Sequence, residues 1–175
     1  MTSFPSWYTL LVLAVAAERV VELAVARRNA AWTRARAGEE HGRGHYPVMV
    51  ALHTGLLACC LLEPALADRP FVPALGLPAL ALVLLAQALR WWCVATLGPY
   101  WNTRVIVVPG ARLVAAGPYR YLRHPNYVAV VVEVAALPLV HSAWLTAAVF
   151  TAANGVLLTV RVRCENTALT RAVPA

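Results

Sequence analysis

The sequence predicts an all-α integral membrane protein, and its composition and its apolar runs carry the prediction. Of the 175 residues, 61% are hydrophobic and only 13% are charged, whereas a soluble domain usually carries about 25% charged residues. The apolar residues gather in long runs, and a helix of about 20 residues is long enough to cross the hydrocarbon core of a bilayer. We therefore expect one membrane domain over residues 1–175 and no separate soluble domain.

Five apolar runs are candidates for transmembrane helices. They cover residues 7–26, 46–64, 70–97, 126–140 and 143–162. Prolines punctuate the start of the third run and Pro138 interrupts the fourth, which leaves open whether each forms one unbroken helix. Only His141 and Ser142 separate the last two runs, and so short a break predicts an antiparallel helical hairpin.

The arginines predict the orientation of the chain. No lysine is present, and the net charge is +7. The arginines lie mainly after the first run, after the third run and in the tail: Arg27, Arg28, Arg34, Arg36, Arg43, Arg104, Arg112, Arg120, Arg123, Arg161, Arg163 and Arg171. The positive-inside rule then puts the N-terminus outside and the C-terminus in the cytosol. Because these cations do not gather on one solvated face, we expect no nucleic-acid partner.

The segment between the third and fourth runs predicts an ordered cytosolic connector. Residues 104–108 have a strand-like composition, and Pro109-Gly110 and Gly117-Pro118 are turn signals. Several aromatic side chains accompany them, and we expect these to pack over a site: Tyr100, Trp101, Tyr119, Tyr121 and Tyr127. The four cysteines have no spacing typical of a zinc site or of a disulfide framework, so we expect no metal.

Ionisable residues inside the first run mark a candidate substrate site, because charges within a membrane helix usually face the bundle interior or a wet cavity. Glu18 and Glu22 share one helical face, and Arg19 is spaced to pair with Glu22. An ion pair that only locks helix packing is the alternative.

Three further ionisable residues are candidates for a catalytic role. His45 begins the second run beside Tyr46, a candidate substrate contact, and His53 lies two turns further on. Glu133 lies inside the fourth run with no cation next to it in sequence. The alternative is that each is a packing or hydrogen-bonded residue, which is the more frequent role of a lone histidine in a helix.

Two polar clusters flank the predicted hairpin. The first precedes and opens the fourth run and comprises Tyr119, Arg120, Tyr121, Arg123, His124, Pro125, Asn126 and Tyr127. The second is Arg161, Arg163, Glu165 and Asn166 at the end of the fifth run. Because a hairpin returns to the face from which it starts, the two clusters are expected to meet. A helix N-terminus with arginine and histidine suits a carboxylate or phosphate, although a belt of Tyr and Arg at the membrane interface is the alternative.

These clusters carry a resemblance to a known family. Arg123-His124-Pro125-Asn126-Tyr127, preceded by Gly117-Pro118-Tyr119-Arg120 and followed by Arg163-Cys164-Glu165-Asn166, resembles the motifs of the isoprenylcysteine carboxyl methyltransferase family over about residues 97–169. The first half looks like the bacterial branch of small membrane methyltransferases associated with alkylpyrones and alkylresorcinols. Two positions depart from the family pattern: Asn166 replaces a glutamate and Ala129 replaces a glycine.

The resemblance implies S-adenosylmethionine as the cofactor, bound by the first cluster and by Arg161, Glu165 and Asn166 of the second. No glycine-rich turn of a Rossmann-like domain is present, so loops and helix ends must hold it. Residues 98–175 are then the cofactor side and residues 1–97 the substrate side. The expected localisation is a bacterial inner membrane, with a lipidic substrate from the bilayer, membrane lipids as surroundings and no obligate protein partner.

The expected reaction is methyl transfer to an oxygen of a lipidic substrate. A phenol or enol acceptor needs a base, for which Glu133, His45 and His53 are candidates. A carboxylate acceptor needs only an arginine such as Arg104 or Arg19 to orient it. Isoprenylcysteine carboxyl methylation and phospholipid N-methylation are alternatives, and a small membrane binding or transport protein is the non-enzymatic one.

Overall fold

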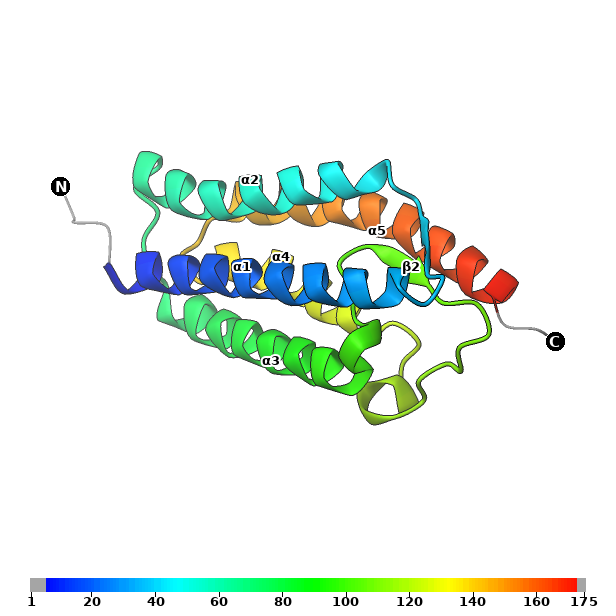
Figure 1. Cartoon of the computed structure of the whole chain (residues 1–175). Coiled ribbons are helices and arrows are strands. Elements are labelled where there is room, and N and C mark those ends of the chain that lie inside the picture. The colour runs from blue at the N-terminus through cyan, green and yellow to red at the C-terminus, as the bar shows by residue number, and fades with distance from the viewer. Residues whose placement is uncertain (1–5, 173–175) are drawn as a thin grey trace.

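Five helices dominate the computed structural model, which describes residues 6–172. They are α1 (Ser6–Arg34), α2 (His45–Leu66), α3 (Pro73–Leu97), α4 (Pro125–Leu139) and α5 (Trp144–Ala172). Consecutive helices alternate in direction within one bundle (Figure 1). The prediction of an all-α membrane protein is confirmed, and the five apolar runs correspond to the five helices.

Three of the helices are long and apolar enough to cross a membrane by themselves within residues 6–172: α2, α3 and α5. Helix α1 is long, at 29 residues, but carries Glu18, Arg19 and Glu22, while α4 has only 15 residues. The third and fourth runs each form one continuous helix. Pro73 opens α3, where no amide hydrogen is needed, and Pro78 and Pro138 lie inside α3 and α4.

Helices α1 and α5 extend past the apolar runs that predicted them. Helix α1 continues to Arg34, where the Gly38 amide donates to the Thr33 carbonyl 2.9 Å away. Helix α5 continues to Ala172. Hydropathy ends at the first charges, whereas a helix ends where its backbone bonding ends. These extensions matter because they carry Asn29 and Glu165 to the connector.

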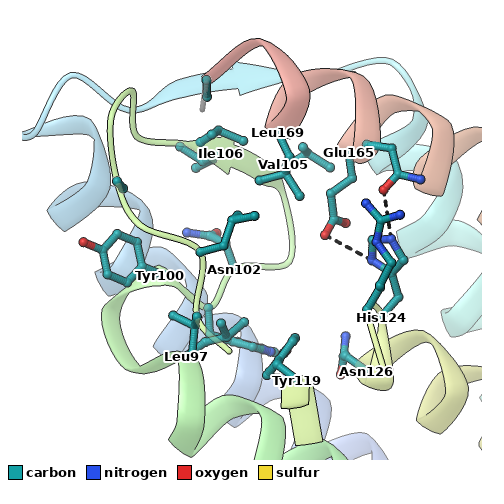
Figure 2. A pocket seen from close by; sticks show the side chains of 18 of the residues that line it. Leu97, Tyr100, Asn102, Val105, Ile106, Tyr119, His124, Asn126, Glu165 and Leu169 are labelled. Carbon is teal, nitrogen blue, oxygen red and sulfur yellow. Dashed lines mark hydrogen bonds and ion pairs between the residues drawn. The ribbon is translucent and has the colours of Figure 1, made fainter. Parts of the chain in front are cut away.

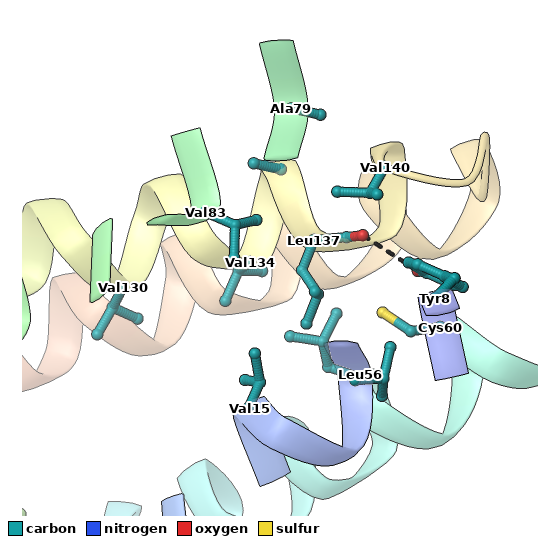
Figure 3. Close-up of a cluster of buried hydrophobic side chains, with 12 residues drawn as sticks. Tyr8, Val15, Leu56, Cys60, Ala79, Val83, Val130, Val134, Leu137 and Val140 are labelled. Carbon is teal, nitrogen blue, oxygen red and sulfur yellow. Dashed lines mark hydrogen bonds between the residues drawn. The ribbon is translucent and has the colours of Figure 1, made fainter. Parts of the chain in front are cut away.

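The apolar core fills the part of the bundle farthest from the connector. Its buried members come from α1, α2, α3 and α4 (Figure 3): Tyr8, Val12, Val15, Leu56, Cys60, Ala79, Val83, Val130, Val134, Ala136, Leu137 and Val140. The Tyr8 hydroxyl donates to the Leu137 carbonyl at 3.1 Å. On α2, the Glu63 carboxylate accepts from the backbone amides of Leu145 and Thr146. This interaction caps the N-terminus of α5 with a negative charge.

The connector between α3 and α4 is ordered. It contains two 3-10 turns, η1 (Gly98–Tyr100) and η2 (Gly117–Arg120), and the strand β2 (Val105–Val107). Strand β2 lies within the predicted strand-like segment. It pairs antiparallel with β1 (Glu39–His41), with Glu40 opposite Ile106. Strand β1 was not expected from the sequence, because Glu-Glu-His has neither the alternation nor the residue types of a strand.

Polar side chains tie the connector to the first helix. Glu40 accepts from Arg104 at 2.6 Å and from Arg34 at 2.9 Å. Burial alone would raise the pKa of the Glu40 carboxyl, but these hydrogen bonds outweigh burial and lower the pKa. The Asn29 amide donates to the carbonyls of Gly98 and Trp101 at 3.0 and 2.8 Å. The connector is therefore held over one end of the bundle, called the connector end below.

Candidate functional site

At the connector end, the hairpin brings the two polar clusters of the sequence together. His124 precedes the first turn of α4, and its Nε2 lies 3.0 Å from Oδ1 of Asn166 on α5. Its Nδ1 lies 3.5 Å from Oε1 of Glu165. The Tyr127 hydroxyl donates to the same carboxylate. Asn166, which departs from the family pattern, thus contacts the histidine through its amide oxygen, as a carboxylate oxygen would.

Electrostatics favour a charged histidine in this cluster. Hydrogen bonding to the Glu165 carboxylate raises the pKa of His124 above its ordinary value of 6.5, against the opposing effect of burial. The Tyr127 hydroxyl accepts from Nε of Arg161 at 2.9 Å. Arg161 also donates to the Thr103 carbonyl at 2.7 Å, which anchors the connector to α5. The result is a continuous chain of polar contacts between α4, α5 and the connector.

A cavity of about 470 Å³ opens beside this cluster. We call it the first cavity. Its walls are the connector, the start of α4 and the last three turns of α5, and Figure 2 shows the Glu165 and His124 side chains on its wall. The volume falls within the range of about 300–1,000 Å³ typical of small-molecule sites.

Most of the predicted cofactor residues line the first cavity, as does Arg104. Those that do are Tyr119, Arg123, His124, Asn126, Tyr127, Arg161, Glu165 and Asn166. Three do not. Arg120 and Tyr121 are exposed and lie against each other, 5.7 Å from guanidinium carbon to ring centre. Pro125 is buried in the first turn of α4.

A second cavity of about 150 Å³ lies inside the bundle, and residues of all five helices and the connector line it. It adjoins the first cavity, because five residues line both: Trp101, Asn102, Asn126, Tyr127 and Arg161. Leucine and valine side chains supply its apolar wall: Leu23, Val50, Leu57, Val130, Leu157 and Leu158. Its polar lining includes Arg19, Glu22, His53, Arg90 and Asn154.

Arg19, Glu22 and Arg90 of this lining belong to a network of charged side chains that also includes Glu133. Arg90 of α3 donates to the Glu133 carboxylate of α4 at 2.7 Å, and its Nε lies 3.5 Å from Oε1 of Glu22. Arg19 donates to Glu22 at 2.9 Å and lies 3.5 Å from Glu133. Glu18 accepts from the side chains of Gln87 and Trp91. The Arg19–Glu22 pair expected from sequence is thus one part of a network that spans three helices.

The predicted substrate and catalytic residues separate into two groups. Arg19, Glu22 and His53 line the second cavity. Four others line neither cavity: Glu18, His45, Tyr46 and Glu133. Tyr46 lies under the Arg104 guanidinium, 4.2 Å from ring centre to carbon, and Glu133 is buried against Arg90 and Arg19.

Several polar residues that line these cavities were not expected from the sequence, among them Arg90, Asn102 and Asn154. Arg90 is 4% exposed and is the one charge within the described part of α3. Asn102 and Asn154 have buried side-chain atoms without a hydrogen-bond partner among residues 6–172. A lone arginine in the third apolar run and a lone asparagine in the fifth were the available signals, since polar residues at such positions are rare.

The fold and the site together define a small integral membrane protein with a mixed-charge cavity at one end of its bundle and a partly apolar cavity inside it. Comparison with known proteins identifies the group. The isoprenylcysteine carboxyl methyltransferase (ICMT) family matches residues 79–171, and the chain belongs to this family. It is therefore a membrane methyltransferase, and members of the family use S-adenosylmethionine.

Two bacterial relatives extend the similarity to almost the whole chain. The uncharacterized protein YpbQ of Bacillus subtilis is 37% identical over 163 residues, which cover 93% of this chain and 96% of the relative. An uncharacterized protein of Haemophilus influenzae is 22% identical over 161 residues, 91% of this chain and 93% of the relative. No solved structure matches the chain.

Proposed function

We propose that this protein transfers the methyl group of S-adenosylmethionine to an oxygen of a lipidic acceptor. The cofactor binds in the first cavity, and the reacting end of the acceptor binds in the second. The two meet at the shared wall formed by Trp101, Asn102, Asn126, Tyr127 and Arg161.

One observation carries this assignment. Except for Ala172, every residue that lines the first cavity lies within residues 79–171, the part of the chain that matches the family. The chemistry common to the family therefore belongs to the first cavity. The second cavity also uses Arg19, Glu22 and His53 from α1 and α2, which lie before the match. Acceptor specificity belongs there.

The side chains of the first cavity fit S-adenosylmethionine. Arg123 and a protonated His124 supply positive charge for its carboxylate. Glu165 supplies an acceptor for its amino group or ribose hydroxyls, and the aromatic rings of Tyr100 and Tyr119 supply faces for its adenine. When bound, the cofactor supplies an electrophilic methyl group on a sulfonium. The protein's contribution is orientation and the exclusion of water.

The second cavity fits the polar end of a lipid. The leucine and valine side chains that line the cavity suit an apolar chain. The outer surface of the bundle also exposes leucine and valine side chains, including Leu13, Leu84 and Val156. Val50 and Thr54 of α2 line the cavity and are also exposed. A lipidic acceptor therefore has a route into the cavity from the bilayer beside α2.

The proposed orientation follows the arginines. The connector end carries the loop after α1, the connector itself and the end of α5, where the arginines concentrate. By the positive-inside rule this end faces the cytosol of a bacterial cell and the N-terminus faces outside. The water-soluble cofactor then reaches the first cavity directly, while the acceptor stays in the membrane.

Titration of the purified protein in lipid nanodiscs with S-adenosylhomocysteine tests the cofactor site. We expect saturable binding that weakens at least tenfold in Glu165→Gln and in His124→Ala. Arg120→Ala is the matched control, since Arg120 belongs to the same sequence cluster but does not line the cavity. Absence of binding, or equal affinity in all four proteins, contradicts the proposal.

A further inference from the structure

We propose that His53 is the general base of this methyltransferase and that the acceptor group is therefore a hydroxyl, not a carboxylate. The inference rests on the proposed function, because it needs an acceptor in the second cavity. It selects one residue from several titratable groups near that cavity. The selection depends on which of them can accept a proton without losing an ion pair.

The hydrogen bonding of His53 determines its tautomer. Nδ1 lies 2.9 Å from the backbone carbonyl oxygen of Met49, one helical turn earlier. A carbonyl oxygen can only accept, so Nδ1 must carry the hydrogen. In the neutral ring Nε2 then has a free lone pair, and no hydrogen bond to Nε2 is formed within residues 6–172. Since His53 lines the second cavity, this nitrogen is available to an acceptor bound there.

The carboxylates near His53 are already engaged by arginines. Glu22 lines the same cavity, but Arg19 binds one oxygen at 2.9 Å and Arg90 lies 3.5 Å from the other. Glu133 does not line the cavity, and Arg90 binds it at 2.7 Å. A proton taken up by either carboxylate would cost an ion pair with a guanidinium group, whereas His53 forms no ion pair within residues 6–172.

Charged side chains from four helices surround His53. Helix α1 presents Arg19 and Glu22, α3 presents Arg90, α4 presents Glu133 and α5 presents Arg161. Two arginines lie on one side of the cavity and a third lies at the wall shared with the first cavity. These guanidinium groups would also stabilise an oxyanion that develops on the acceptor.

The proton transfer balances the overall reaction. The acceptor O–H bond breaks, and its proton forms an N–H bond at Nε2 of His53. The oxygen keeps the electron pair and uses it to bond the methyl carbon, while the sulfur keeps the electrons of the broken carbon–sulfur bond. The products are a methyl ether, a neutral thioether and an imidazolium, which later returns its proton to water. A carboxylate acceptor is already ionised at neutral pH and needs no such base.

Two phenols of different acidity provide the test. Wild type, His53→Gln and the control Thr159→Val, which alters an exposed α5 residue that lines neither cavity, are compared in nanodiscs with 4-dodecylphenol, 4-dodecyl-2-nitrophenol and dodecanoate. General base catalysis contributes about 10²–10⁴-fold, so we expect His53→Gln to slow phenol methylation by at least a hundredfold. The nitrophenol is more acidic and needs little assistance from a base, so its methylation rate should fall far less in His53→Gln. The pH dependence of the phenol reaction should lose one titration in His53→Gln.

The tautomer of His53 can be measured by NMR, independently of enzyme activity. In protein labelled with ¹⁵N-histidine, the signals that disappear in His53→Gln should be those of a ring with hydrogen on Nδ1 and none on Nε2. The opposite tautomer overturns the proposal, as do equal losses on both phenols. Methylation of dodecanoate alone, unchanged in His53→Gln, also overturns it while leaving the proposed function intact. Failure of the wild type to bind S-adenosylhomocysteine would instead refute the proposed function.

Discussion

Replacing Arg90 by methionine is expected to destabilise the protein severely. Arg90 and Glu133 are 4% and 2% exposed, and their side chains meet at 2.7 Å inside the bundle. Methionine preserves an unbranched chain of similar length but removes the charge. Glu133 would then lose its nearest cation, and Glu22 would lose one of its two.

The distances set the size of the effect. Breaking a buried ion pair by removing one partner costs about 3–5 kcal/mol, because the other charge stays buried. Arg19 remains 3.5 Å from Glu133 and 2.9 Å from Glu22, so we expect the lower end, about 3 kcal/mol. Against a total stability of about 5–15 kcal/mol, this is a large fraction.

Unfolding in mixed micelles by titration with sodium dodecyl sulfate, followed by circular dichroism, measures the change. Arg69→Met is the control, because the Arg69 side chain is 37% exposed where it pairs with Glu63 and ion pairs near the surface contribute about 0–1 kcal/mol. The double variant Arg90→Met/Glu133→Leu removes both charges and should recover much of the loss. Our interpretation is refuted if Arg90→Met costs no more than Arg69→Met, or if the double variant is no more stable than Arg90→Met alone.

Two further predictions concern the connector end. Protonated His124 stabilises the fold fully below pH 6.5, and this contribution is lost as the pH rises through its raised folded-state pKa. In an NMR titration Glu165→Gln should return that pKa toward 6.5, and an unchanged value would contradict the assigned pairing. Gly117 has a φ of +52°, and an added Cβ would lie 2.5 Å from Oγ1 of Thr96, so Gly117→Ala should cost at least about 1–2 kcal/mol and lower Tm. Gly44→Ala, at a φ of −67° with no atom within 4 Å of the added Cβ, should leave Tm nearly unchanged; equal shifts in both variants would contradict the strain at Gly117.

The sequence by itself determined the class of fold and most of the first cavity. Long apolar runs leave the backbone no alternative to helices in a bilayer, and the two-residue break at His141 and Ser142 required the last two helices to return antiparallel. The hairpin in turn required the clusters around His124 and Glu165 to meet. Local pattern and chain connectivity were sufficient for these features because the residues involved are close to the ends of adjacent helices.

Only the tertiary structure decided which charges inside the bundle face each other and which face a cavity. Glu133 has no cation near it in sequence, yet Arg90, 43 residues earlier, binds it. That contact, together with the hydrogen bond of His53 Nδ1 to its own helix, is the ground on which we propose His53 as the base. The rotation of each helix about its axis is set by packing among several helices at once, and the weak amphipathicity of helices in a bilayer leaves little trace of that rotation in the sequence.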